Sequence, residues 1–363
     1  MSATEDEDPL GQAVEKTVEG PLFRYKRRDR WEERKKKDRE KHPEGSQAGD
    51  ELTLLSMNVW FEFVYRTTRN AELLRLLQET APTVACFQEA VSDFVHVLHS
   101  DPWVRAHYIS TGQPHSRYGC LILLRIDRCL RPSLARTELP SSMGRDLLVA
   151  RFELRASDGR VVPISLATVH LESLSFRDLR ARQLRWYAHA HARTNGAAEH
   201  PSRLSILCGD FNFCSQRNWS ADDTRPLEND ALPELLPGFV DVWQALHGTH
   251  PPLLHPPEDP VLRRAIGYTF DTDLNGNIGD STPEHMRYDR VMARFDPARW
   301  QARSIRLIGD QPCLKNLPER KSVFGKPAKD SAVEVVPTRE IWPSDHFGLL
   351  TNFHLADQKD CNK

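Results

Sequence analysis

Short apolar runs bounded by polar residues recur along the chain from Leu52 to Phe353. Runs of this length, rich in Val, Ile, Leu and Phe, are typical of buried strands. Two longer segments repeat their apolar residues with a helical period instead, at residues 69–80 and 176–193. The pattern therefore predicts two helices there, and strands at residues 52–59, 83–87, 119–124, 146–154, 162–171, 204–208, 288–294 and 347–353.

Strands in hairpin-like series with intervening helices predict an α/β fold, in which mixed sheets stack and helices flank them. From Pro233 to Arg287 the chain is instead rich in Pro, Gly and His. This composition predicts surface loops around a site.

Residues 1–50 lack the globular pattern. An acidic start is followed by a charged segment, residues 24–41, which holds 11 Lys or Arg and 5 Asp or Glu, and then by a polar, linker-like stretch. We predict a disordered charged tail with a basic arm at 1–50, one globular domain at 51–356 and a short tail at 357–363. The arm has two interpretations: a nuclear-localisation or phosphate-binding element, or a solvated, partly helical segment.

Composition narrows the classes of function. The formal net charge of −2 excludes a globally basic nucleic-acid binder, so a polyanion would be held by local patches, bound cations or the arm. The longest apolar runs are far shorter than the roughly 20 residues that cross a bilayer, and the start has no signal-peptide pattern. The 7 cysteines include no CxxC pair, which favours neither disulfides nor a zinc knuckle and indicates a reducing compartment, the nucleus or the cytoplasm.

Polar residues stand where the apolar runs end, and rigid strand ends hold side chains precisely. These residues are Asn58, Glu89, His170, Asp210, Asn212 and Asp289, with Asp345 and His346 just before the last run.

Together these side chains meet the requirements of phosphodiester hydrolysis: charge neutralisation, a positioned water and relief of charge on the leaving oxygen. Glu89 suits a hard cation such as Mg²⁺. Asp210 and Asn212 project to one side of an extended segment, so the carboxylate can accept the proton of a water that the amide orients. His346 can donate to a phosphate oxygen, while Asp289 fixes its tautomer and raises its basicity.

Each element alone is weak evidence. A QE pair usually lies at the surface, and GDxN is more often an ordinary turn. His170 alone would be a hydrogen-bonded strand histidine, and Asp289 beside two arginines would be a structural ion pair. Their occurrence together in one order carries the interpretation.

That order, N…QE…HLES…GDFN…YDR…SDH, resembles the endonuclease/exonuclease/phosphatase superfamily from Leu52 to Phe353. The resemblance implies a four-layer α/β-sandwich of two packed mixed β-sheets flanked by helices, as in DNase I, with the catalytic domain at 51–356. Within the superfamily, six segments are most similar to the tyrosyl-DNA phosphodiesterase 2 group: residues 139–154, 170–173, 241–246, 268–279, 287–294 and 343–350.

The resemblance also implies roles. Glu89 would bind Mg²⁺, or Mn²⁺ as the alternative, with Asn58 near metal and phosphate and Asp345 beside the metal network. The further implied roles are Asp210 and Asn212 at the water, His170 and His346 at the scissile phosphate, Asp289 behind His346, Ser173 and Tyr118 facing the phosphate or the end of the DNA, and Phe270 lining the groove. Phe270 has a second interpretation as a core aromatic, although an exposed ring there can stack on a base.

Two departures from the group stand out. Cys214 occupies the position of a phosphate-binding arginine, for which Arg217, three residues on, is the candidate replacement. The group's ubiquitin-binding amino-terminal domain is not evident.

The implied function is hydrolysis of 5′-phosphotyrosyl-DNA adducts to leave a 5′-phosphate, as in DNA repair. The implied partners are DNA 5′ ends or protein–DNA adducts, with no membrane span, and we expect a monomer. The alternatives are an abasic-site endonuclease, a deadenylase, a lipid or inositol phosphodiesterase, and, from another class, an inactive binding scaffold.

Overall fold

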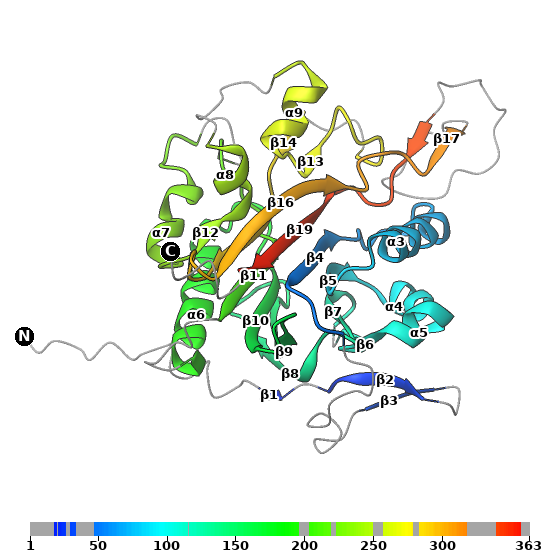
Figure 1. The fold of residues 1–363 in the computed structure, drawn as a ribbon. Helices are drawn as coiled ribbons and strands as arrows, with labels where there is room; N and C mark the ends of the chain where they lie inside the picture. Colours follow the sequence, from blue (N-terminus) through cyan, green and yellow to red (C-terminus); the bar gives the residue numbers. More distant parts are fainter. Residues whose placement is uncertain are drawn as a thin grey trace, which may run out of the picture.

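In the computed structural model, two large sheets lie face to face (Figure 1). The structure describes residues 18–19, 21–26, 30–33, 47–114, 116–195, 203–218, 223–249, 257–278, 283–317 and 339–356.

The first sheet has seven strands in the order β1-β8-β9-β10-β11-β15-β12. Their bounds are Val18–Glu19, Leu130–Glu138, Asp146–Arg155, Val161–His170, Leu204–Asp210, Asp289–Arg294 and Val240–Asp241. Neighbours are antiparallel except β10 and β11, which run parallel.

The second sheet has eight strands in the order β16-β19-β4-β5-β7-β6-β2-β3. Their bounds are Trp300–Ile308, Gly348–Leu355, Glu51–Asn58, Val84–Ala90, Gly119–Arg125, Tyr108–Ser110, Phe23–Lys26 and Arg30–Glu33. Here the parallel pair is β4 and β5.

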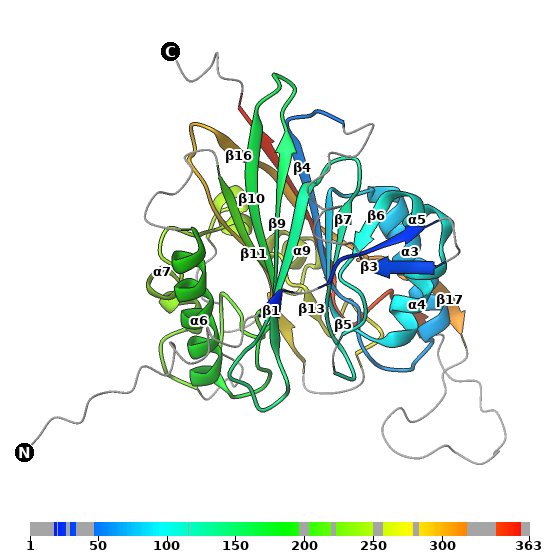
Figure 2. The same cartoon turned by 90° about the horizontal axis from the view of Figure 1, so that it is seen from below.

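Helices cover the outer face of each sheet (Figure 2). α3 (Arg66–Thr80), α4 (Ser92–Ser100) and α5 (Pro102–His107) pack on the second sheet, and α6 (Arg177–Asn195) and α7 (Leu232–Leu235) pack on the first. The main core lies between the sheets, where alternate residues of strands such as β4 and β10 interleave. The predicted four-layer α/β-sandwich is therefore confirmed. No helix among the described residues is long and apolar enough to cross a membrane.

The region predicted as loops between Pro233 and Arg287 also contains short elements. They are α7, β12, α8 (Val242–His247), α9 (Pro260–Ile266) and the ribbon β13 (Phe270–Asp271) with β14 (His285–Met286). Outside it, the described residues add the 3₁₀ helix η1 (Glu228–Ala231) and a second ribbon, β17 (Leu314–Leu317) with β18 (Arg339–Ile341).

Within residues 1–50, the segment expected to be a disordered charged tail, the structure describes three short strands. β1 pairs with β8 at the edge of the first sheet, and β2 pairs with β6 and β3 at the edge of the second. Leu22, between them, is fully buried in the core. Burial of this leucine and the free edge of β6 favour pairing despite the high charge of the segment. The rest of the basic arm and residues 357–363 lie outside the described residues.

Strand register brings the polar strand ends together. His170 pairs with Asp210 at the ends of β10 and β11, and Asp210 pairs with Asp289 across to β15. In the other sheet, Asn58 at the end of β4 is beside Gln88 in β5. The ends of β4, β5, β10 and β11 thus meet at one end of the sandwich.

Gly209 makes a close approach that places Asp210. Its φ is +129°, and a Cβ atom there would lie 2.0 Å from the Val169 carbonyl oxygen. We expect Gly209→Ala to lower the free energy of unfolding by about 3 kcal/mol or more, because strain and a backbone clash add. Chemical denaturation measures this, with Gly159→Ala as control: its φ is +88° but nothing lies within 4 Å of the new Cβ, so a loss of about 1 kcal/mol is expected. Equal losses at both sites would contradict the role of the contact.

Candidate active site

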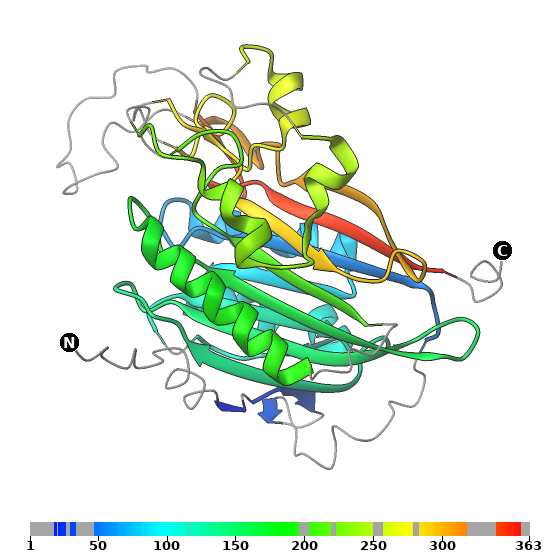
Figure 3. The same cartoon turned by 90° about the vertical axis from the view of Figure 1, so that its left-hand side faces the viewer.

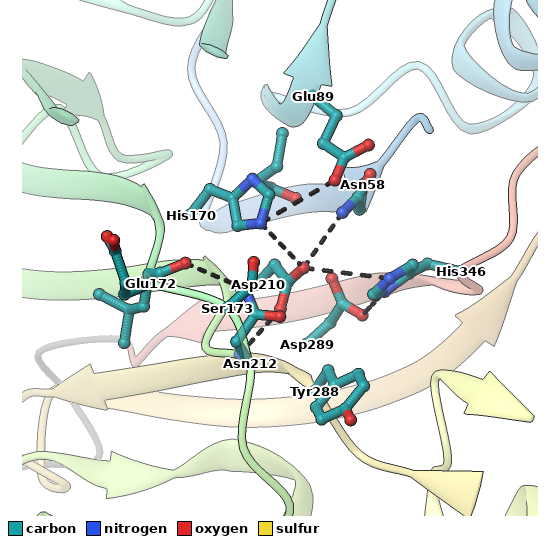
Figure 4. A network of polar contacts seen from close by, with 12 residues as sticks. Asn58, Glu89, His170, Glu172, Ser173, Asp210, Asn212, Tyr288, Asp289 and His346 are labelled. Carbon is teal, nitrogen blue, oxygen red and sulfur yellow. Dashed lines mark hydrogen bonds and ion pairs between the residues drawn. The ribbon is translucent and has the colours of Figure 1, made fainter. Parts of the chain in front are cut away.

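Asp210 is the centre of a buried polar cluster (Figure 4). Its Oδ2 accepts a hydrogen bond from Asn58 Nδ2 at 3.1 Å and lies 3.4 Å from His170 Nε2 and 3.9 Å from His346 Nε2. Burial alone would raise the pKa of Asp210, but the two histidines and two hydrogen bonds lower it below its ordinary value. Asp210 is therefore a carboxylate at neutral pH.

His346 is held from behind by Asp289. The distance from His346 Nδ1 to Asp289 Oδ2 is 2.8 Å, and Asp289 is fully buried. Burial lowers the pKa of His346, but the charge of Asp289 and its hydrogen bond raise it more, to well above 6.5. The ring is an imidazolium at neutral pH, and its Nε2–H faces Asp210 across a gap.

Glu89 and Asp345 form an excess of negative charge at the edge of the cluster. Glu89 Oε2 accepts the Phe61 amide at 2.9 Å, while Oε1 lies 3.9 Å from His170 Nε2. Burial and then the charge of Asp345 raise the pKa of Glu89 to about 7. Burial also raises the pKa of Asp345, although His346 and Arg69 oppose this.

Buried carboxylates whose pKa values are raised by burial and by a neighbouring carboxylate fit a hard cation with oxygen ligands. Glu89 and Asp345, with Asn58 nearby, are the residues that would hold it.

Backbone conformation at two of these positions is strained. Glu89 has φ 57° within a bulge between β5 and β7, and Asn212 has φ 56°. Such conformations persist where the surroundings enforce them, and they concentrate at functional sites. The Asn212 amide N–H donates to Asp210 Oδ1 at 2.8 Å and its Nδ2 donates to the Leu171 carbonyl, which leaves its side-chain oxygen to orient a water.

Arg145, the last residue of the loop before β9, contacts the other side of His170. Its Nη1 lies 3.0 Å from His170 Nδ1, and its Nη2 donates to Ser173 Oγ at 2.8 Å. Because a guanidinium only donates, Nδ1 is the acceptor and the proton of His170 is on Nε2. Burial and then Arg145 lower the pKa of His170 to about 3, which agrees with a neutral ring.

The loop before Arg145 is anchored by Glu172. This fully buried carboxylate accepts hydrogen bonds from Ser141 Oγ at 2.6 Å and from the Ser142 amide at 2.9 Å. Gln183 of α6 contacts it in turn. The sequence analysis did not identify Arg145, because no motif marks this arginine. It does lie in segment 139–154, which resembles the tyrosyl-DNA phosphodiesterase 2 group.

Aromatic rings flank the polar cluster on two sides. The Phe270 ring centroid lies 5.1 Å from that of His346 and 5.6 Å from that of Tyr288. Tyr118 stacks on Phe61 at 4.8 Å, and Arg145 Nη1 reaches its hydroxyl at 3.4 Å. Phe270 is half-buried, and its ring lies against His346 at the side of the cluster.

Cys214 and Arg217 lie apart from this cluster. Cys214 is buried against Tyr268 and Met286, where its Sγ accepts the Arg287 amide. Arg217, half-buried nearby, forms no hydrogen bond or ion pair with the cluster in the described structure; its charge acts on Tyr268. Arg145, in contrast, contacts the cluster directly, through His170.

A second group of metal-ligating types lies behind Phe270. Asp271, Asp273 and His285 place ligand atoms within 4.8 Å of one another. Arg263 already contacts both carboxylates, at 3.3 Å and 2.7 Å. This group is therefore an ion-pair network that holds the β13–β14 ribbon.

Comparisons with known proteins find the same fold in solved structures. Structurally similar proteins include TDP2 from D. rerio in a complex with single-strand DNA product (TM-score 0.58, 22% identity, 84% of this chain and 99% of that chain). TDP2 from Caenorhabditis elegans (0.56, 17%, 84% and 97%) and the human Nocturnin catalytic domain with bound sulfate (0.52, 15%, 84% and 95%) are also similar. A sequence search among curated proteins finds no match.

At these identities the solved structures establish the shared fold alone. The sequence model of the Endonuclease/Exonuclease/phosphatase family matches residues 55–346, which include the whole polar cluster. The chain belongs to the endonuclease/exonuclease/phosphatase family.

Proposed function

We propose that this protein hydrolyses phosphodiesters with a bound divalent cation, Mg²⁺ in the first place, and that its substrate is DNA with tyrosine linked to a 5′ phosphate. One observation carries the proposal: an ionised Asp210, a charged His346 and Glu89, a carboxylate suited to bind a cation, lie close together. Aromatic rings flank them on both sides.

The reaction divides among the residues of the cluster. The cation, when bound, neutralises charge on the phosphate and on the leaving oxygen. Asp210 accepts the proton of a water that the Asn212 side-chain oxygen orients. His346, as an imidazolium, and His170, through Nε2–H, donate hydrogen bonds to phosphate oxygens whose charge grows in the transition state.

The proposed substrate, DNA linked to tyrosine, is supported by the aromatic rings on the two sides of the cluster. Phe270, beside His346, offers a ring on which a base stacks without sequence preference. Tyr118, stacked on Phe61 and touched by Arg145, offers a second wall for a tyrosyl ring and a cation for the phosphate. The sequence similarity of residues 268–279 and 287–294 to the tyrosyl-DNA phosphodiesterase 2 group supports the same substrate. Such a substrate would place the protein in the nucleus.

A substrate panel tests the proposal. A 5′-tyrosyl oligonucleotide, an abasic duplex, a poly(A) strand, a sugar phosphate, sphingomyelin and an inositol phosphate are compared with Mg²⁺ and with chelator. We expect magnesium-dependent release of tyrosine and a 5′-phosphate end from the first substrate at the highest kcat/KM. Turnover of only the sugar, lipid or inositol phosphates would refute the DNA substrate but leave phosphate ester hydrolysis standing.

Arg145 should contribute to phosphate binding. Charged hydrogen bonds contribute about 1.5–3 kcal/mol, so Arg145→Leu should raise KM by about 10- to 100-fold. Arg145→Lys should restore only part of the lost substrate affinity, because a lysine ammonium cannot contact His170 and Ser173 at the same time as the forked guanidinium does. The matched control is Arg136→Leu on β8, whose guanidinium pairs with Asp146. Steady-state kinetics on the 5′-tyrosyl oligonucleotide measure the effect, and equal KM values for the two leucine variants would contradict it.

A further inference from the structure

A hollow lies between helix α6, which crosses the first sheet in Figure 3, and the outer face of that sheet. Its volume is about 300 Å³. This is near the lower limit of small-molecule sites and roughly twice the volume of an apolar cavity that holds benzene. We call it the α6 pocket; its walls include Leu147, Val149, Arg151, Trp186, Tyr187 and His191.

The pocket is separate from the polar cluster. Ser165 lines it, five residues before His170 in β10, and a strand rises about 3.3 Å per residue, so the two lie about 17 Å apart. Leu147, Val149 and Arg151 share the outer face of β9 because alternate residues of a strand point the same way. Small residues on opposite walls, Ala135 in β8 and Ala190 in α6, leave the space open.

Arg151 brings an unbalanced positive charge into these apolar walls. It is half-buried and forms no ion pair or side-chain hydrogen bond in the described structure. Burial, and then the charge of Arg203, lower its pKa. A smaller hollow of about 150 Å³ is also lined by Arg151, together with Arg203, Arg131 and Glu153. The carboxylate of Glu153 is paired with Arg131.

A buried donor points to the same kind of ligand. Trp186 is 1% exposed, and its Nε1–H has no acceptor within the described chain. His191 is kept neutral by burial and by Arg294, Arg203 and Arg151, which lower its pKa to about 4. Among the described residues, the walls of the α6 pocket therefore hold donors and cations but no carboxylate.

We propose that the α6 pocket binds a small organic anion with a flat apolar body, such as an aromatic carboxylate. The rings of Trp186 and Tyr187 and the side chains of Leu147 and Val149 cover the body of the ligand. Its carboxylate pairs with Arg151, for which the described residues supply no ion-pair partner. The proposal is independent of the reaction at Asp210.

Isothermal titration calorimetry of the full-length protein with 2-naphthoate tests this directly. The comparison ligand is 2-naphthamide, which has the same shape but no charge. We expect one site for 2-naphthoate and at least tenfold weaker binding of the amide. Arg151→Leu should remove that tenfold difference, while Arg160→Leu, in the same β9–β10 hairpin region but paired with Asp158, should preserve it.

Filling the space tests the cavity itself. Ala190→Phe from the helix and Ala135→Phe from the sheet should each abolish binding of both ligands, and thermal melting shows which variant is folded. Because the two substitutions come from opposite walls, one folded variant is sufficient. No binding at millimolar 2-naphthoate, equal affinity for acid and amide, or undiminished binding to a folded Phe variant would each overturn the proposal.

Discussion

Glu89→Gln should lower kcat/KM on the best substrate by about a thousandfold or more. A metal ion contributes several kcal/mol of transition-state stabilisation, and each 1.36 kcal/mol corresponds to tenfold in rate. The amide keeps the size of Glu89 and its contact with the Phe61 amide, but it loses the charge that holds a cation. Steady-state kinetics measure the loss, with Glu153→Gln on β9 as a control of equal charge change outside the cluster.

The same substitution should stabilise the metal-free protein at pH 8. Burial and Asp345 raise the pKa of Glu89 from 4.5 to about 7, so ionisation above pH 7 opposes folding by on the order of 3 kcal/mol. An acid whose pKa is higher in the folded than in the unfolded protein contributes its full stability below the unfolded pKa, here 4.5. It loses this contribution as the pH rises through the folded pKa, here about 7. The gain from Gln should therefore shrink between pH 7 and 4.5. Urea denaturation in chelator measures this, and a variant less stable at pH 8 would mean that Glu89 is a structural partner.

His346→Ala should lower kcat by about 10³- to 10⁴-fold, the range of positioned acid–base and electrostatic groups. The alanine removes the imidazolium that faces Asp210 and leaves Asp289 buried without its partner. His354→Ala, near the far end of β19, is the matched control and should retain activity. Wild-type turnover by a folded His346→Ala protein would contradict the assignment.

Asp289→Asn separates charge from ring position. Asp289 is the largest influence that raises the pKa of His346 against burial. The asparagine should therefore lower that pKa, and the imidazolium should be lost at lower pH. The alkaline limb of the kcat profile should move to lower pH, whereas a uniform loss of activity without a moved limb would mean that Asp289 only packs behind the ring.

The sequence was most informative where a polar residue with a chemical role ends an apolar run. Asn58, His170 and Asp210 each end such a run, and strand pairing then brings them together. The strands that sequence missed have other patterns. β8 and β16 alternate buried and exposed residues, since one face of each meets solvent.

Arg145 and the amino-terminal strands show what a single sequence leaves out. Arg145 becomes part of the site only because Glu172, 27 residues later, anchors its loop through Ser141 and Ser142. Pairing of β2 with β6 depends on a free sheet edge that no local pattern announces. Such long-range contacts are set by tertiary structure, not by local propensity.

The central claim is that one cation and one phosphate bind where Glu89, Asp210 and His346 meet. Crystals soaked with Mn²⁺ and a 5′-phosphorylated oligonucleotide, measured at the manganese absorption edge, test it most directly. The account predicts an anomalous peak in contact with a Glu89 oxygen and a phosphate facing His346. A peak at Asp271, Asp273 and His285 instead, with none at Glu89, would contradict it.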